Sequence, residues 1–530
     1  MAKTATTGHR ESFGARASLA LLPALLSAAL CLGAGGSPSP VAAASDPWRA
    51  KVDRWVLGRV EAGGDGEFLI VLAEQADLSA ATRLATKSDQ GRFVVDRLRA
   101  VAARTQPPLL AALAARGAVA RPYWIVNLIW ARGDLATVQA MAGRPDVARI
   151  AANPWVPARL PLPAAIVDRG SALAAAVEPN LVHVGAPDFW AAGFTGQGAV
   201  VAGADTGVDW DHPALRSHYR GWNGSAAGHD YHWHDAIHSG GGVCGADSPF
   251  PCDDHGHGTH TMGTMVGDDG GDNQVGMAPG AKWIACRNMD QGNGTPATYA
   301  ECFQFFLAPT DLAGANPDPA LAPDVINNSW ICTPGEGCTD PTVLRMVVEN
   351  TRAAGIAVVA AAGNSGPSCS SVDTPPAIYD AAITVGATDN SDLITTFSSR
   401  GPVTVDGSGR LKPDLTAPGL QVRSSLPGGG YGTLSGTSMA GPHVTGMVAL
   451  LLSAAPCLAS DVDGLEAYLK QTALPRTTAQ TCGGVPGSQV PNSVYGYGAL
   501  RAVLPGGSLC PLFSDGFESG DTGAWSAAVP

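Results

Sequence analysis

Short, almost wholly apolar runs alternate with polar or glycine-rich turns over the larger part of the chain, from about residue 178 to residue 504. These runs occupy 199–204, 282–289, 325–330, 357–362 and 382–388. Between them lie stretches with helical spacing, such as 341–354, whose apolar residues share one face and after which Gly355 provides a stop signal. Apolar strands that alternate with helices indicate a parallel sheet covered on both faces. The pattern therefore predicts an α/β fold with functional residues near the carboxyl ends of the strands.

The preceding part of the chain, from about residue 46 to residue 155, has a different pattern. It predicts strands at 68–73, 123–131 and 147–152, and helices at 93–103 and 135–142. Asp134 is placed to cap the second helix, and Gly143 is placed to end it. This order is typical of a small α+β unit of the ferredoxin-like kind. The low-complexity stretch from Leu160 to Val177 is expected to be a linker.

The first residues resemble an export signal. Basic residues run to Arg16, an apolar stretch follows from Ala17 to Gly33, and small residues at 42–44 offer a cleavage site before Ser45. The alternative is a membrane anchor, but Pro23 and the residues that follow Gly33 disfavour a spanning helix. No later segment is long and apolar enough to cross a membrane. We therefore expect a signal peptide at 1–44, a secreted or periplasmic protein, and no stable membrane insertion after cleavage.

The charge and the cysteines narrow the class of protein. The formal net charge is -13, which disfavours nucleic acid as a partner. Of the 11 cysteines, Cys31 lies in the signal, which leaves an even number for an oxidising compartment. Cys244 with Cys252, Cys332 with Cys338, and Cys457 with Cys482 are candidate disulfides. Zinc binding is the alternative, but the paired C-x-x-C spacing of zinc modules is missing.

Three separated segments each place one reactive residue at the end of a predicted element. Asp205 ends the apolar run that starts at residue 199, and His257 lies in a stretch of glycines and small residues that would let a helix start pack tightly against its neighbours. Ser438 comes four residues before Pro442, so we expect a helix to begin near Ser438 and to continue as a buried helix through 444–452.

Each segment taken alone has a structural explanation. Asp205 could cap a turn, and Ser438 could be the cap of its helix. His257 and His260, together with the nearby His255, could hold a metal, although the zinc protease pattern H-E-x-x-H is absent.

Taken together, the segments resemble the subtilisin-like serine proteases, which carry their reactive residues in the order Asp, His, Ser. The strings at 257–260 and 436–443 carry the resemblance, which covers roughly 181–504. A further match at 361–366 contains Asn364, where the family keeps its oxyanion asparagine. The insertion between Asp205 and His257 and the strand at 283–289 are most similar to the bacillopeptidase F branch.

The resemblance implies a secreted serine endopeptidase that is made as an autoprocessed precursor. It implies a subtilisin-like peptidase domain at 176–505 after an inhibitor-like propeptide at 45–165, with a short tail at 506–530. Asp205, His257 and Ser438 would be the catalytic triad, and Asn364 with the backbone N–H of Ser438 would bind the oxyanion.

Substrate binding follows from the same resemblance. The edge formed by Ser329, Trp330 and Ile331 would pair with the substrate backbone, which suits broad specificity. The family usually has glycine at the position of Ile331, so this branched side chain is expected to narrow the cleft. The expected partners are protein or peptide substrates and the chain's own propeptide, and we expect a monomer.

Metal binding is open at two loops. No cofactor is expected for catalysis, but calcium is an alternative at the acidic loop of Asp268, Asp269 and Asp272. The insertion contains further histidines that either bind a metal or belong to a solvated loop closed by Cys244 and Cys252; they are His229, His232, His234 and His238.

Two rival functions remain at this point. A catalytically silent binding or scaffold protein could have the same fold. A zinc hydrolase could use His257 and His260.

Overall fold

The structure is a computed structural model that describes residues 46–157, 160, 177–333 and 338–506. Its largest sheet has seven strands in the order β14-β13-β12-β11-β6-β8-β7. All of its strand pairs are parallel, which confirms the predicted α/β fold. The strands are β6 (Val200–Asp205), β7 (Trp233–Asp235), β8 (Lys282–Arg287), β11 (Val325–Asn328), β12 (Ala357–Ala361), β13 (Ile383–Thr388) and β14 (Leu415–Pro418). The two edge strands, β7 and β14, were not predicted, whereas the five central strands were.

Helices cover this sheet on both faces. They are α5 (Pro179–Val184), α6 (Ala186–Ala191), α7 (His257–Val266), α8 (Pro296–Leu307), α9 (Arg345–Ala353), α10 (Thr437–Ala454) and α11 (Val462–Thr472). Along β6, Val201 belongs to the apolar cluster that contains α7 and α10, whereas Ala202 and Ala204 belong to the cluster that contains α8 and α9. This alternation places one core on each side of the sheet, as expected for a doubly covered parallel sheet.

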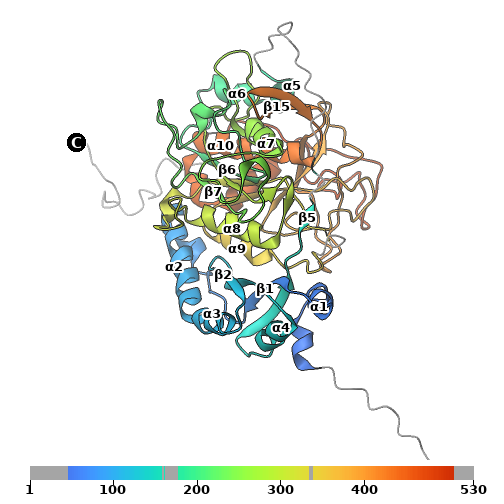
Figure 1. The fold of residues 1–530 in the computed structure, drawn as a ribbon. Coiled ribbons are helices and arrows are strands. Elements are labelled where there is room, and N and C mark those ends of the chain that lie inside the picture. Colours follow the sequence, from blue (N-terminus) through green and yellow to red (C-terminus); the bar gives the residue numbers. More distant parts are fainter. Residues whose placement is uncertain (1–45, 158–159, 161–176, 334–337, 507–530) are drawn as a thin grey trace, which may run out of the picture. The chain divides into compact units, whose positions relative to one another are not determined.

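The predicted central helix is α10, which lies beside α7 (Figure 1) and contacts the strands β11 to β14. Its residues from Thr437 to Leu452 are buried. Pro442 lies inside the helix and has no N–H, so the carbonyl of Ser438 loses its helical partner. The hydroxyl of Ser329 donates to that carbonyl instead, at 3.0 Å.

Residues 46–157, which we call the N-terminal module, form a second, smaller sheet. Its strands are β1 (Gly66–Leu72), β2 (Val119–Tyr123), β3 (Leu128–Gly133) and β4 (Val147–Ala152), in the antiparallel order β2-β3-β1-β4. Its helices are α1 (Arg54–Glu61), α2 (Lys87–Thr105), α3 (Pro107–Ala114) and α4 (Leu135–Ala142). The strand order and the helical crossovers are those of a ferredoxin-like unit. Asp134 caps α4 by accepting from the backbone N–H of Thr137, and Gly143 ends it, as predicted.

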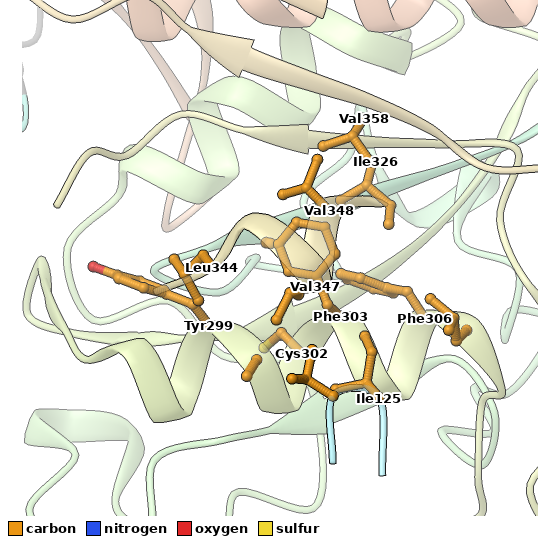
Figure 2. Packing of buried hydrophobic residues seen from close by; sticks show 14 of the residues in the cluster. Ile125, Tyr299, Cys302, Phe303, Phe306, Ile326, Leu344, Val347, Val348 and Val358 are labelled. Atoms are coloured by element: carbon orange, nitrogen blue, oxygen red, sulfur yellow. The ribbon is translucent and has the colours of Figure 1, made fainter. Parts of the chain in front are cut away.

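One expected strand of the module is wrong. Instead of one strand at 123–131, β2 ends at Tyr123, residues 124–127 form a turn, and β3 begins at Leu128. The turn is apolar because Ile125, which is fully buried, packs into the cluster of Phe303 and Phe306 on α8 (Figure 2).

Hydrogen bonds accompany this contact between the N-terminal module and the helices α8 and α9. They run from Tyr123 Oη to Glu301 Oε2 (2.8 Å), from Trp124 N to Gln304 Oε1 (2.6 Å), from Asn350 Nδ2 to the carbonyl of Ile125 (2.6 Å) and from Ala297 N to Asn153 Oδ1 (2.9 Å). The module is therefore held by both apolar and polar contacts.

The remaining elements are short. Two small sheets contain β5 (Val156–Pro157), β9 (Met289–Asp290) and β10 (Asn293–Gly294), and the hairpin of β15 (Val422–Leu426) and β16 (Gly430–Leu434). Short 3₁₀ helices lie at Pro47–Lys51, Ala81–Arg83, Arg216–His218, Gly242–Cys244, Pro319–Leu321 and Pro456–Ser460.

The disulfides correct one expectation and add another bond. Cys244–Cys252 and Cys332–Cys338 form as predicted. Cys482 pairs with Cys369 rather than with Cys457, so that predicted pairing is wrong. The true partners lie 113 residues apart, and only the fold brings them together. Cys286 on β8 also pairs with Cys302 on α8.

Several expectations fall outside the described residues. These are the signal peptide at 1–44, nearly all of the linker at 160–177, and the tail beyond residue 506. Within the described residues, no helix has the length and apolar character needed to cross a bilayer.

Candidate active site

The carboxylate of Asp205 and the ring of His257 form a buried pair. Asp205 is the last residue of β6 and His257 is the first residue of α7. His257 Nδ1 lies 2.7 Å from Asp205 Oδ1, and the two residues are only 1% and 2% exposed. Because Nδ1 faces a carboxylate, it carries the ring proton, and Nε2 is left as an acceptor. Nε2 is buried and has no hydrogen-bond partner among the described residues.

Asp253 fixes the turn that leads into His257. Its Oδ1 accepts from the backbone N–H of Gly256 at 2.8 Å and from the hydroxyl of Thr206 at 2.8 Å. Its Oδ2 accepts from the backbone N–H of Thr259 at 2.9 Å. The start of α7 is thereby tied to the residue that follows Asp205, which fixes the imidazole against its carboxylate.

Glycine is required where these two segments cross. A side-chain carbon on Gly258 would collide with the carbonyl of Gly207. The tight approach of the helix start to its neighbours, predicted from the small residues around His257, is therefore observed.

Ser438 is the second residue of α10 and is 4% exposed. Its hydroxyl donates to the carbonyl of Ser329 at 3.2 Å, and the described residues show no hydrogen bond between Ser438 and His257. Their helices, α10 and α7, pack against each other. In structures without substrate, catalytic hydrogen bonds are often long or poorly aligned and tighten only when substrate binds.

Asn364 lies just beyond the carboxyl end of β12 and is exposed. Its side-chain oxygen accepts from the backbone N–H of Thr437 at 2.9 Å and from the Thr437 hydroxyl at 3.0 Å. This orientation leaves the amide NH₂ as a donor. The N–H of Ser438 is one of the first amides of α10, which have no partner within the helix. The site thus offers two donors to an anion.

The edge of β10, which lies beside this site, is already paired with another strand of the chain. Asn293 and Gly294 of β10 pair antiparallel with Pro157 and Val156 of β5. The segment Ser329 to Ile331, predicted to bind substrate, lies beyond the end of β11.

Ser329 and Trp330 are buried, and the Trp330 ring stacks on Tyr299 with the ring centroids 3.7 Å apart. Ile331 lies close to Gly363, whose hypothetical side-chain carbon would be 4.0 Å from Ile331 Cγ2. Its narrowing effect on the cleft stays a prediction.

The other histidines near His257 have separate structural roles. His260 Nε2 contacts the carbonyls of Val422 at 3.0 Å and Gly432 at 3.2 Å, in the β15–β16 hairpin. Burial lowers the pKa of His260 to about 3, so the ring is neutral and donates to these carbonyls. In the described parts of the chain, no group of three or more His, Cys, Asp or Glu side chains is arranged to hold a metal.

The histidines of the insertion are also dispersed among protein partners. His229 contacts the Tyr219 hydroxyl, and His232 accepts from Arg220. His234 and His238 both contact Glu301 Oε1, each at 2.9 Å.

The carboxylates of the acidic loop accept hydrogen bonds from their own loop. Asp269 accepts from the backbone N–H of Gly271 and from the side chain of Asn273, and Asp268 accepts from the N–H of Gly270. These carboxylates already satisfy their own loop, so calcium binding there stays a prediction.

Comparison with known proteins decides the family. The sequence pattern of the subtilase family, peptidase family S8, matches residues 196–498, which is more than half of the chain. The chain belongs to the subtilase family of serine peptidases. This confirms the predicted family, and the match to bacillopeptidase F confirms the branch.

Bacillopeptidase F of Bacillus subtilis (strain 168) is 42% identical over 334 residues, which are 62% of this subtilase and 22% of the relative. Subtilisin E of the same strain is 32% identical over 285 residues, or 53% of this chain and 63% of the relative. A subtilisin of Bacillus pumilus is 32% identical over 285 residues, which are 87% of that relative. The subtilase thus spans less than two thirds of the first two relatives.

Sequence reasoning missed two features of the subtilase site. Thr437 orients Asn364, and its position directly before Ser438 was the available signal. The Asn293–Gly294 edge carries the strand pairing, and the glycines at 292 and 294 were the signal there. Both act through contacts that the fold creates, which leave little trace in a single sequence.

Proposed function

We propose that this subtilase is a serine endopeptidase whose triad is Asp205, His257 and Ser438. The observation that supports it most directly is the buried hydrogen bond of 2.7 Å between Asp205 and His257, which leaves Nε2 free. A serine hydroxyl is a poor nucleophile at neutral pH and needs such a base.

The proposed reaction is acyl transfer in two halves. His257 Nε2 accepts the proton of Ser438 as its Oγ attacks the peptide carbonyl, and the amine leaves with a proton from the same nitrogen. Asp205 orients the ring and stabilises the imidazolium without taking a proton. Water then hydrolyses the acyl-enzyme by the same route.

The oxyanion would be bound by the Asn364 amide and the backbone N–H of Ser438. Thr437 supports this role because its two hydrogen bonds hold the Asn364 oxygen, which leaves the NH₂ group of Asn364 as a donor. Such donors stabilise charge that develops only in the transition state.

The substrate would add a strand to the Asn293–Gly294 edge and would also use the Ser329–Ile331 segment. Backbone pairing places few demands on substrate side chains, so protein substrates of broad sequence are expected. Pairing of β5 with β10 supports this interpretation, because a segment of the chain itself lies where a substrate strand would lie.

We propose that the N-terminal module is an inhibitory propeptide. It contacts α8 and α9, and its last strand covers the β10 edge. Removal would follow a cut between about residue 155 and residue 178, carried out by the enzyme itself. The protein would be exported, would act as a monomer, and would have protein or peptide substrates together with its own propeptide.

The test is a Ser438→Ala variant compared with wild type and with Ser435→Ala, a serine three residues earlier. Ser438→Ala should lose peptidase activity by about 10⁴–10⁶-fold and should remain uncut. A serine-directed phosphonate should label Ser438 in wild type and in Ser435→Ala. A folded wild-type protein that resists labelling would support the silent scaffold instead. Activity that is retained in a strong chelator and lost under the phosphonate would dismiss the zinc hydrolase.

A further inference from the structure

A buried arginine lies directly behind the candidate site. Arg287 ends β8, beside Asp205 of β6 and Asp235 of β7 in the register of the sheet. It is fully buried, and a guanidinium cannot lose its charge in a protein. A buried charge is tolerated only when it is paired and hydrogen-bonded, so its partners show what it holds together.

The partners of Arg287 come from three separate segments. Nη1 donates to Asp235 Oδ2 at 3.2 Å, and Nη2 donates to Asp254 Oδ2 at 3.0 Å. Nη2 also lies 3.6 Å from Asp290 Oδ1. In addition, the guanidinium donates to the carbonyls of Gly241 and Gly245 in the insertion. One cation is therefore shared by three carboxylates.

Two of these carboxylates lie on different parts of the site, one on the turn before His257 and the other on the β9–β10 hairpin. Asp254 lies three residues before His257, on the turn that leads into α7. Asp290 lies on β9, which pairs with β10 and supports the edge offered to a substrate. The other oxygen of Asp254, Oδ1, accepts from the backbone N–H of Gln291 at the tip of this hairpin, at 3.0 Å.

The contact is reinforced at the hairpin tip. A hypothetical side-chain carbon on Gly292 would lie 3.4 Å from the ring of His255. Gln291 itself has a positive φ of 49°, a conformation that a non-glycine residue keeps only when its surroundings enforce it. The hydrogen bond to Asp254 is one such restraint.

We propose that Arg287 and Asp254 are positioning residues for proteolysis, which lock the β9–β10 hairpin to the turn that carries His257. This inference rests on the proposed function. It assigns no bond-making role to either residue: they keep the bound peptide and the base in register, and misplacement by about 1 Å can cost about 10²-fold in rate.

The protonation of Asp254 should tune this lock. Burial raises the pKa of Asp254 to about 7, although Arg287 and the N–H of Gln291 oppose the rise; the carboxylates of Asp253 and Asp290 add to it. The charged or titratable groups that face Asp254 are thus Arg287 on β8, Asp290 on β9, and Asp253 on its own turn.

These neighbours determine the direction of the pH effect. Below the raised pKa, Asp254 carries a proton and can hydrogen-bond to Asp290. Above it, Asp254 carries a buried charge that Arg287 neutralises only in part, because Arg287 is shared with Asp235 and Asp290, and this charge faces the carboxylates of Asp253 and Asp290, which weakens the hold on the hairpin. Substrate binding should therefore weaken, and KM should rise, as the pH increases through about 7.

The experiment measures kcat and KM from about pH 6 to about pH 8 for the processed enzyme. Asp254→Asn keeps an oxygen for the Gln291 N–H but cannot ionise, so its KM should lose the rise seen in wild type. Asp254→Ala should lower kcat/KM by about 10–100-fold at every pH. Asp406→Asn, which alters an exposed aspartate paired with Arg410, is the matched control and should behave as wild type.

Phosphonate titration of Ser438 in each variant makes the outcomes distinguishable. A wild type that is not labelled contradicts the proposed function. The positioning role is overturned if the variants are labelled and active but behave as wild type. In that case Asp254→Asn would retain the wild-type dependence of KM on pH, and Asp254→Ala would retain the wild-type kcat/KM. Arg287→Lys gives a second arm, because a lysine cannot bridge the carboxylates in the same way and should reproduce the loss seen in Asp254→Ala.

Discussion

The two faces of the module's sheet are buried in different ways. Along β1, Phe68 and Ile70 point into a core that the N-terminal module builds from its own helices α1, α3 and α4. Leu69 and Val71, which alternate with them, belong to the cluster that also contains α8 and α9. The first face makes the module a folded unit. The second is an apolar surface that shares its cluster with the module's own α2 and with α8 and α9 of the peptidase part, so part of the burial on this face depends on docking.

The two faces differ most at Ile125. This residue is fully buried in the cluster of the second face, near Phe303 and Phe306 of α8 (Figure 2). Ile125→Asp would place a carboxylate in that apolar cluster and should weaken docking by more than about 5 kcal/mol. In a Ser438→Ala background, hydrogen exchange should show loss of protection in α8 and retained protection in β1 and β3.

Ile125→Val is the control for this experiment and should leave the exchange pattern nearly unchanged. If Ile125→Asp left α8 protected, the second face would not depend on docking and the distinction between the faces would fail.

A change on the first face should give the opposite pattern. Phe68→Ala removes a fully buried ring from the module's own core and should destabilise the module by about 3–5 kcal/mol. Protection should be lost in β1 and β3 themselves, as followed by the same exchange measurement. Val119→Ala on β2, where the side chain is exposed, should stay within about 0.5 kcal/mol of the parent.

The peptidase side of the interface has its own covalent support. The Cys286–Cys302 disulfide joins β8 to α8 and closes a loop of 16 residues. Replacing both cysteines by alanine should lower the stability of the peptidase part by about 3 kcal/mol, measured by thermal unfolding. As a control, adding a reductant should not lower the stability of α8 in this variant any further. A larger loss of stability in the module than in the peptidase part would contradict the assignment of this bond to the peptidase side.

The smallest expected effect concerns the polar rim of the second face. Burial lowers the pKa of His238, but its hydrogen bonds to Glu301 and Asp247 outweigh burial, and the net pKa is raised. A raised pKa means that the contribution to stability is fully present below the ordinary histidine value, about 6.5, and is lost as the pH rises through the folded value.

His238→Gln should therefore cost up to about 1 kcal/mol at acid pH, since solvent screens this half-buried pair, and almost nothing at alkaline pH. The measurement is the Tm of the Ser438→Ala precursor against pH. His229→Gln, in the same insertion, is the control; a pH-independent difference for His238→Gln would show that the ion pair is not its cause.

The five central strands of the large sheet could be predicted because both of their faces are buried within the same domain. Runs such as 357–362 therefore carry an unbroken apolar signal. The segment 123–131 carries a similar signal for another reason: its turn is buried by α8, far along the chain. Local pattern cannot distinguish an apolar strand from an apolar turn that docks on a distant helix.

The same limit applies to the site. The residues proposed for catalysis stand in recognisable strings, so sequence alone suggested them. Thr437, Asp254 and Arg287 act by hydrogen bonds between segments that only the fold brings together. Nothing in the order of the chain shows that Arg287 and Asp254 meet.

The Cys369–Cys482 disulfide has a consequence for a peptidase exposed to copies of itself. The bond spans 113 residues, and Ser438 lies inside that span whereas Asn364 lies before it. A single self-inflicted cut anywhere inside the span would leave both fragments covalently joined. The nucleophile and its amide partner would remain on one particle, so nicking would not by itself disperse the catalytic machinery.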